Sequence, residues 1–369
     1  MSQPPDDSVT TPLDASTVAF APEISGRSST DRYSRQTLFA GIGARGQRRL
    51  RSATLAIVGC GALGTVLANN CVRAGVGRVR LADRDYIELN NLQRQILFDE
   101  TDIARGLPKA IAAAQRLRAI NHEVVVEPLV ADVTVDNIEQ LIEGADVVLD
   151  GTDNFETRYL LNDACVRAGI PWIYSGVIAA YGVTMTVVPH TTACLRCVFP
   201  ERPLPGTTPT CDTAGVLNGI VGVIAGIAAT EALKLLVGSE QLARGMTWID
   251  LWENTFDHFE VPRQDECPAC GLGHYEYLEA TDVGLGITLC GRNAVQVRAM
   301  GSVGASARLD LAALAERLRP VGEVTNNAFL LRLRVDGYEL TIFPDARAII
   351  KGTDDPAVAR SIYARYVGA

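Results

Sequence analysis

A glycine-rich segment between two apolar runs restricts the fold of this chain more than any other feature. The apolar run ATLAIV predicts a buried strand, GCGALG a turn, and the residues after it a helix. In that arrangement Gly59, Gly61 and Gly64 let the backbone approach phosphate groups at the positive end of the helix dipole. Asp83 ends the next apolar run, where an acid about twenty residues after such a turn binds a ribose. The pattern predicts a nucleotide-binding α/β fold, although some glycine turns of this kind only pack closely.

Strands and helices alternate through the following residues, which predicts a mostly parallel sheet flanked by helices. Such a Rossmann-like sheet binds its ligands at the carboxyl ends of its strands. Two later segments, residues 183–188 and 247–251, are expected to extend the sheet, and an antiparallel direction is open for both. The expected strands are residues 53–58, 79–82, 124–126, 147–149 and 172–175, and the expected helices are residues 108–120, 136–142 and 155–168.

Composition divides the chain into three parts. Residues 1–30 are rich in Ser, Thr, Pro and Asp and lack the basic start and apolar core of a signal peptide, so we expect a disordered leader. Residues 31–280 form the α/β unit. Residues 281–369 predict a small α+β domain, with a hairpin turning at Asp336 and Gly337 between residues 329–335 and 339–343.

The charge and the cysteine count exclude several classes of protein. A net charge of −9 argues against a protein that binds nucleic acid, because such proteins carry basic surfaces. The apolar segment from Gly215 to Gly238 is interrupted by Glu231 and Lys234 before it reaches the length of a membrane span, so we expect a buried helix and no membrane. Nine cysteines are an odd number, which does not suggest a disulfide framework and favours a reducing cytoplasm.

Two Cys-x-x-Cys pairs predict a metal site. Cys194 and Cys197 lie in CLRC, and Cys267 and Cys270 lie in CPAC. Four thiolates on two turns match a closed, tetrahedral zinc site, which stabilises loops but cannot activate water. A redox pair is the less favoured alternative.

Polar residues after Asp83 separate this chain from an enzyme that uses NAD. Asn90, Asn91, Arg94 and Gln95, followed by Lys109, are expected at one edge of the sheet. Such donors suit a triphosphate that must be held and split, although each could lie in a solvated loop. Lys109 begins a helix, where the dipole opposes a cation unless an anion lies nearby.

Acidic residues follow the strand at 147–149. Asp150 and Asp153 stand where the strand becomes a loop, as a magnesium ligand would. Asp153 with Asn154 could equally cap the next helix.

Cys211 lies in a proline- and threonine-rich loop before the long apolar segment. A thiol near a helix N-terminus can become nucleophilic. The alternative is a small residue that happens to be cysteine.

These motifs together resemble those of the ThiF/MoeB adenylyltransferases, bacterial relatives of the ubiquitin-activating enzymes, over roughly residues 31–275. The matching pieces are RYSRQ, GCGALG, LADRD, NNLQRQ, GLPK, DGTDNFETR, CLRC, CDTAG and CPACG. Members of this family use ATP and Mg²⁺ to adenylate the C-terminal glycine of a ubiquitin-like sulfur-carrier protein. The resemblance therefore implies that enzyme activity, a carrier partner, a sulfur donor such as a cysteine desulfurase, and a homodimer.

The resemblance also implies roles for single residues. Asp83 would bind the ATP ribose, and Asp153 would bind Mg²⁺. Arg35 of RYSRQ would reach the ATP of a neighbouring subunit, and Cys211 matches a cysteine that some members link covalently to the carrier. Asn91, Arg94 and Lys109 would bind the phosphates. The zinc ligands would be Cys194, Cys197, Cys267 and Cys270.

Residues 281–369 favour one of two pathways that use sulfur carriers. Cys290 is followed by a predicted strand, unlike the catalytic cysteine of a rhodanese domain. This part resembles the C-terminal extension of longer ThiF-type proteins, which favours a ThiS-like carrier and thiamine thiazole synthesis over activation of the molybdopterin synthase small subunit. A NAD-dependent oxidoreductase and a non-catalytic carrier-binding scaffold are the less favoured alternatives.

Overall fold

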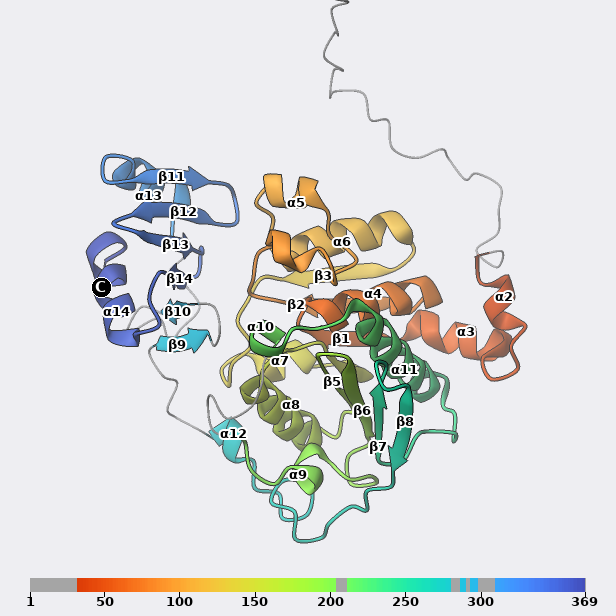
Figure 1. The fold of residues 1–369 in the computed structure, drawn as a ribbon. Helices are drawn as coiled ribbons and strands as arrows, with labels where there is room; N and C mark the ends of the chain where they lie inside the picture. Colours follow the sequence, from red (N-terminus) through yellow and green to blue (C-terminus); the bar gives the residue numbers. More distant parts are fainter. Residues whose placement is uncertain (1–31, 204–210, 280–285, 290–292, 298–308, 369) are drawn as a thin grey trace, which may run out of the picture.

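The computed structural model describes residues 32–203, 211–279, 286–289, 293–297 and 309–368. Its larger part is built on one eight-stranded sheet with the order β3-β2-β1-β4-β5-β6-β7-β8 (Figure 1). Strands β3 to β5 in that order are parallel, and β6, β7 and β8 are antiparallel to their neighbours. The strands are β1 (Thr54–Val58), β2 (Arg78–Ala82), β3 (Val125–Leu129), β4 (Val147–Asp150), β5 (Trp172–Ile178), β6 (Tyr181–Val187), β7 (Met246–Asp250) and β8 (Thr255–Phe259).

Helices cover both faces of this sheet. On one face α4, α6 and α11 bury a core of Leu, Ile, Val and Ala side chains against the strands. On the other face α7, α8 and α9 bury a second core that also contains the paired cysteines. The helices of this unit are α2 (Ser34–Thr37), α3 (Gly43–Ser52), α4 (Ala62–Ala74), η1 (Leu89–Asn91), α5 (Glu100–Ala104), α6 (Lys109–Ile120), α7 (Ile138–Ile142), α8 (Phe155–Ala168), α9 (Leu195–Val198), α10 (Cys211–Ala214), α11 (Asn218–Val237) and α12 (Glu276–Glu279).

The strand register creates the edge at which a ligand would bind. Val58, the last residue of β1, pairs with Ala82 of β2 on one side and with Asp150 of β4 on the other. The chain leaves β1 toward β2 and later returns on the opposite side as β4, so the strand order reverses at this point. A crevice at such a reversal is the usual ligand site of an open α/β sheet. The predicted mixed, mostly parallel Rossmann-like sheet is confirmed.

The long apolar helix α11 is an element of the core. It is the one described helix that is long and apolar enough to cross a membrane, and 50% of its most apolar window is buried inside the protein. Its Ile and Ala side chains pack against α4 and the sheet. Glu231 on this helix is buried and accepts the N–H of Ala243 at 2.9 Å. This packing agrees with the buried helix expected from the sequence.

The C-terminal residues form a separate antiparallel sheet with the strand order β11-β12-β13-β14-β10-β9. Its hairpin turns at Asp336 and Gly337, which have φ of 52° and 82°, as the sequence predicts. The helices α13 and α14 pack on this sheet and bury a third core. The elements are β9 (Gly286–Leu289), β10 (Ala294–Val297), α13 (Leu311–Leu318), β11 (Glu323–Asn326), β12 (Leu331–Val335), β13 (Tyr338–Ile342), β14 (Ala348–Lys351) and α14 (Pro356–Tyr366).

Several expectations differ from the structure or lie outside it. Strands β8 and β11 were not expected, because neither carries a clear apolar alternation. The residues around Arg35 form the short helix α2, which Tyr33 and Gln36 fix to the α/β unit. The expected leader, the boundary at residue 280 and Cys290 lie outside the described residues.

Candidate active site

The glycine-rich turn brings two loops into direct backbone contact. A Cβ atom at Gly64 would lie 1.9 Å from the carbonyl oxygen of Gly59, and one at Gly59 would lie 2.6 Å from the carbonyl oxygen of Gly151. Gly59 also has φ of 90°, which favours glycine. Gly151 follows β4, so these contacts join the loops on either side of the point where the strand order reverses. The sequence motif did not reveal that Gly151 belongs to this cluster.

Gly61 differs from the other glycines of the turn. A Cβ atom there would meet no protein atom closer than 3.9 Å, so the protein itself does not require glycine at this position. Gly61 is the N-cap of the 13-residue helix α4, and no side chain caps this helix terminus. Beside it lies the buried Gln95, whose Oε1 has no hydrogen-bond partner. An uncapped helix N-terminus with room for a Cβ atom, and an orphaned amide oxygen beside it, fits the phosphates and sugar of a nucleotide.

Asp83 lies next to this turn. One carboxylate oxygen accepts the N–H of Cys60 and the other accepts the N–H of Asp85, both at 2.6 Å. Burial raises the pKa of Asp83 above its ordinary value, whereas the charge of Lys109 and the two N–H donors lower it. The carboxylate is thus fixed at the end of β2, where the sequence places a ribose-binding acid.

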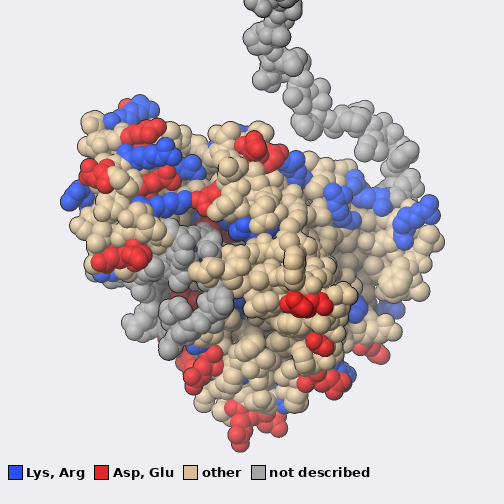
Figure 2. All heavy atoms as spheres, in the orientation of Figure 1, with Lys and Arg blue, Asp and Glu red and all other residues tan. Residues whose placement is uncertain are grey.

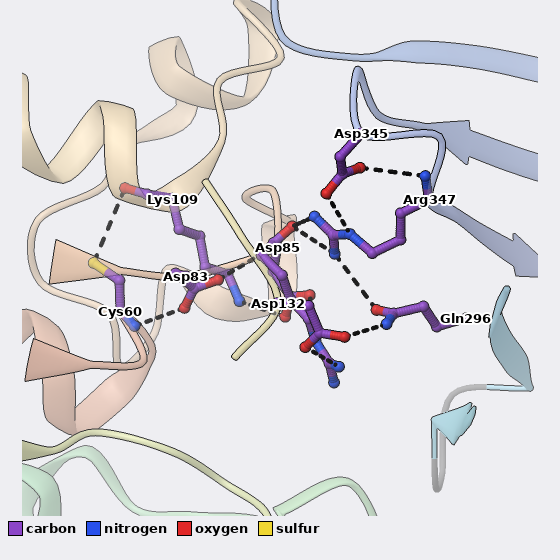
Figure 3. A network of polar contacts seen from close by, with 9 residues as sticks. Cys60, Asp83, Asp85, Lys109, Asp132, Gln296, Asp345 and Arg347 are labelled. Atoms are coloured by element: carbon purple, nitrogen blue, oxygen red, sulfur yellow. Dashed lines mark hydrogen bonds and ion pairs between the residues drawn. The ribbon is translucent and has the colours of Figure 1, made fainter. Parts of the chain in front are cut away.

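Lys109 is buried and directed toward the same place. Its Nζ lies 3.2 Å from a carboxylate oxygen of Asp85, and its backbone N–H donates to the Asp85 carbonyl at 2.9 Å (Figure 3). The sequence predicts an anion beside this helix start, and Asp85 supplies one within the chain. Asp85 was missed as a site residue, although it follows Asp83 by only two positions.

The remaining phosphate-binding candidates lie in and after η1. The Asn91 side chain accepts the N–H of Glu88 and donates to the Asn90 side chain, so it stabilises the local turn. Arg94 donates to the carbonyl of Asn90 at 2.7 Å, and this contact is exposed to solvent. Arg94 is therefore placed at the surface, whereas Asn91 is buried.

Asp150 and Asp153, the acidic residues at the end of β4, differ in burial and in role. Asp150 is fully buried, accepts two hydrogen bonds from Thr152 and pairs with Arg158 at 3.2 Å. Burial raises the pKa of Asp150, and the Arg158 charge opposes that shift. Asn154 caps α8 by accepting the N–H of Thr157 at 2.9 Å, and Asp153 beside it is exposed. Asp150 thus supports the loop, and Asp153 is the carboxylate of the pair that a metal could reach.

The paired cysteines meet in one buried cluster. The Sγ atoms of Cys194 and Cys267 are 3.6 Å apart, those of Cys197 and Cys270 are 3.4 Å apart, and all four lie within 4.8 Å of one another. A tetrahedral zinc ion with bonds of about 2.3 Å places its sulfur ligands about 3.8 Å apart. The cluster is therefore consistent with a structural zinc site, as the spacing predicts.

Arg35 lies far along α4 from the glycine turn, and Cys211 lies beside β5. The neighbouring Gln36 donates to the carbonyl of Ala74 at the far end of α4, so α2 lies at the opposite end of that helix from the glycine turn. Cys211 begins the short helix α10 and does not precede α11 directly, which corrects the expected position at the start of the long helix. Its Sγ contacts the carbonyl of Val177 at 3.7 Å.

The fold and this site define an α/β protein of Rossmann type, with a candidate nucleotide site at the carboxyl edge of its sheet and a separate buried cluster of four cysteines. The chain matches the ThiF family over residues 33–269 and therefore belongs to it. It is 46% identical over 342 residues to the sulfur carrier protein ThiS adenylyltransferase of Bacillus subtilis (strain 168), an alignment that covers 92% of this chain and 100% of that protein. An alignment of this length necessarily includes most of the C-terminal unit.

More distant proteins share the larger unit. The SAMP-activating enzyme E1 of Haloferax volcanii is 40% identical over 253 residues, with 68% of this chain and 93% of that protein covered. A crystal structure of E. coli MccB with ATP has a TM-score of 0.58 at 25% identity and covers 66% of this chain and 75% of that one. Family and relatives confirm the adenylyltransferase class expected from the sequence.

Proposed function

We propose that this chain uses ATP to adenylate the C-terminal glycine of a ThiS-like sulfur-carrier protein, with release of pyrophosphate, for thiamine thiazole synthesis. The observation that carries the proposal is the uncapped helix N-terminus at Gly61, which has room for a Cβ atom and lies beside Asp83 and Lys109. Similarity to a ThiS adenylyltransferase over 92% of the chain supports the choice of carrier. An NAD-dependent oxidoreductase would leave the basic residues and the cysteine cluster without a purpose.

The reaction needs charge neutralisation and positioning more than proton transfer. An oxygen of the carrier's ionised C-terminal carboxylate attacks the α-phosphorus of ATP, and the bond from that phosphorus to the bridging oxygen breaks. Pyrophosphate leaves with the bond electrons, so no general base is required. Asp83 would hold the ribose, the N–H groups of α4 would face the phosphates, and Arg94 and Lys109 would neutralise them.

Mg²⁺ is the expected metal of this reaction, and the exposed Asp153 fits it. A hard oxygen ligand at the carboxyl end of β4 is the donor that Mg²⁺ prefers, and Asn154 already satisfies the helix terminus. Bound there, Mg²⁺ would supply positive charge to the phosphates. The zinc site would be structural, because four thiolates leave no open position for a substrate.

A homodimer accounts for the position of Arg35. Helix α4 has 13 residues and is about 20 Å long, so Arg35 lies far from the glycine turn of its own chain. Basic side chains gather around α2 and α3 (Figure 2), and the exposed Leu38 and Phe39 follow Arg35. This surface suits contact with a second subunit, whose ATP Arg35 would then reach.

The remaining parts of the proposal concern Cys211, the sulfur donor and the compartment. Cys211 would form a covalent or disulfide link with the carrier, or serve only as a small residue. A cysteine desulfurase is the expected sulfur donor, and the cytoplasm is the expected compartment.

Exchange of labelled pyrophosphate into ATP tests the proposal. Wild-type protein should catalyse exchange that depends on the carrier. Arg94→Ala and Lys109→Met should each lower the rate at least about a hundredfold, as expected when one charge-stabilising donor is lost. Arg116→Ala is the matched control, because it removes the ion pairs of a half-exposed arginine with Asp99 and Asp102 at the start of α5 and should leave the rate unchanged.

Three outcomes would contradict the proposal. Near-normal exchange in both variants would remove Arg94 and Lys109 from the site. Exchange only with the molybdopterin synthase small subunit would show that the proposed carrier is wrong. Turnover of NADH without any exchange would show that the enzyme is an oxidoreductase.

A further inference from the structure

The C-terminal sheet contacts the α/β unit along the segment that links β2 to α6. That segment carries Asp83 and Asp85 together with the phosphate-binding candidates in and after η1, and Lys109 follows it as the first residue of α6. Figure 3 shows side chains from the C-terminal unit meeting the network of Asp83 and Asp85. Among the described residues, five side chains of the C-terminal unit make the contacts described below.

Arg347 makes the most buried of these contacts. Its side chain is 1% exposed, its Nη1 and Nη2 lie 3.5 and 3.4 Å from the carbonyl oxygen of Arg84, and its guanidinium lies over the ring of Phe343. The Nε group pairs with Asp345 at 3.3 Å. Burial lowers the pKa of Arg347, and the Asp345 charge opposes that shift. A buried guanidinium is costly unless its donors are satisfied, so the Arg84 carbonyl is a required partner.

Gln296 extends this contact to a second loop. Its Oε1 accepts from Arg347 at 3.4 Å, and its Nε2 donates to Asp132. The other carboxylate oxygen of Asp132 pairs with the Arg84 side chain at 2.9 Å. Arg84 is thus held at its backbone by Arg347 and at its side chain by Asp132.

Further contacts fix the segment on both sides of Arg84. Lys351 pairs with Glu88, the N-cap of η1. Arg332 lies over the ring of Tyr86, 4.4 Å from its centroid. Asn327 donates to the carbonyl of Gly106 at 2.9 Å, shortly before α6 begins. The C-terminal unit therefore contacts the linking segment near its start, at η1 and near its end.

Arg84 stands between the two acids of the nucleotide site. The N–H of Asp85 donates to Asp83, and the Asp85 carboxylate pairs with Lys109. A shift of the Arg84 carbonyl rotates the peptide bond that carries the Asp85 N–H, since the two groups share one plane. Any such rotation moves the donor away from Asp83.

We propose that Arg347 is a positioning residue for the nucleotide site, acting through the Arg84–Asp85 peptide bond. The C-terminal unit is then a part of the ATP site and not only an appended domain. The proposal rests on the proposed function for the identity of the nucleotide. It requires no contact between Arg347 and ATP.

The test compares Arg347→Met and Arg347→Lys with Arg317→Met in the full chain. Arg317 is the matched control, because its guanidinium donates to Val367 within the C-terminal unit at 3.0 Å. The measurements are the dissociation constant of ATP by calorimetry, and KM for ATP, KM for the carrier and kcat in the exchange reaction. Gln296→Leu provides a second variant that keeps Arg347 and removes its link to Asp132.

Arg347→Met and Gln296→Leu should weaken ATP binding and raise KM for ATP about tenfold or more, as expected for a misplaced binding group. KM for the carrier should stay within about twofold, Arg347→Lys should recover part of the loss, and Arg317→Met should resemble wild type. ATP affinity within about twofold of wild type in both Arg347→Met and Gln296→Leu would overturn the proposal. An equal loss in Arg317→Met would also overturn it, because general damage to the unit would then explain the effect. ATP binding by wild type without carrier-dependent exchange would contradict the proposed function, while the calorimetric comparison would still test Arg347.

Discussion

Glycines that look equivalent in the sequence serve different purposes in the structure. Gly64 has no room for a side chain, because its neighbour is the main chain of Gly59. Gly61 has room on the protein side and faces the space assigned to the nucleotide. We therefore expect Gly64 to be required by the fold and Gly61 by the proposed nucleotide.

This difference predicts opposite effects of the same substitution. Gly64→Ala should cost more than about 3 kcal/mol of unfolding free energy or prevent folding, because two backbones must separate. Gly61→Ala should fold with a normal melting temperature and bind ATP at least about tenfold more weakly, because its Cβ occupies the ligand space. Denaturant titration and calorimetry measure the two effects. Equal stability losses in both variants would contradict this assignment.

Asp163 gives a prediction for pH. It is buried in α8, accepts the N–H of Tyr277 and a hydrogen bond from Asn162, and burial raises its pKa from 3.8 to about 6. The folded protein therefore binds more protons than the unfolded chain between these two values, so the contribution of Asp163 to stability falls as pH rises through this window.

Asp163→Asn should remove that dependence. Relative to wild type, the variant should gain of the order of 1–3 kcal/mol as pH rises from about 4 to about 7, and the difference should then stay constant. Chemical denaturation across this range measures it. A difference that does not change with pH would show that Asp163 titrates normally.

At the scale of elements, the cysteine cluster joins the segment after β6 to the segment after β8, two strands that are not neighbours in the sheet. Cys194 and Cys197 lie around α9 after β6, and Cys267 and Cys270 lie after the exposed edge strand β8. Gln264 adds a hydrogen bond to the carbonyl of Cys197 at 3.0 Å. The metal would therefore hold the chain that leads from the sheet toward the C-terminal unit.

Purified protein should contain about one zinc ion per chain, and Cys270→Ser should lose both the metal and stability, since closed thiolate sites contribute folding free energy. Metal analysis and thermal unfolding with and without a chelator test this. Cys165→Ser is a useful control, because Cys165 is buried away from the cluster in α8. A metal-free wild type with an unchanged melting temperature would contradict a structural zinc site.

At the scale of the whole molecule, the sheet and the N-terminal helices place Arg35 and Asp153 at different ends of one subunit. Asn121 at the end of α6 donates to the hydroxyl of Tyr33 at 2.8 Å, which holds α2 away from the start of that helix. Asp153 follows β4 at the carboxyl edge of the sheet. A site that uses both residues therefore requires two subunits.

Mixing Arg35→Ala with Asp153→Ala subunits should restore exchange activity, because one site of the mixed dimer then has both residues. Each variant alone should be nearly inactive, and the restored rate should approach about half that of wild type in a pure mixed dimer. Mixing two different Asp153 variants is the control and should restore nothing. A monomer in sedimentation at assay concentration would contradict the dimer directly.

The sequence by itself determined the parts that depend on local pattern. Glycine spacing, strand–helix alternation and two Cys-x-x-Cys pairs were enough to predict the sheet, the point where its strand order reverses and the four-cysteine cluster. The Asp336–Gly337 turn was predictable for the same reason, because positive φ favours these residue types.

Only the tertiary structure decided which residues support the site from a distance. Gly151, Asp85 and Arg347 have no signal of their own, because their roles depend on a neighbour far away in the chain or in another element. The exposed strand β8 was missed because its stability comes from pairing with β7 and not from an apolar face. Packing and long-range hydrogen bonds connect residues that no local pattern relates, and here they connect the C-terminal unit to the nucleotide edge of the sheet.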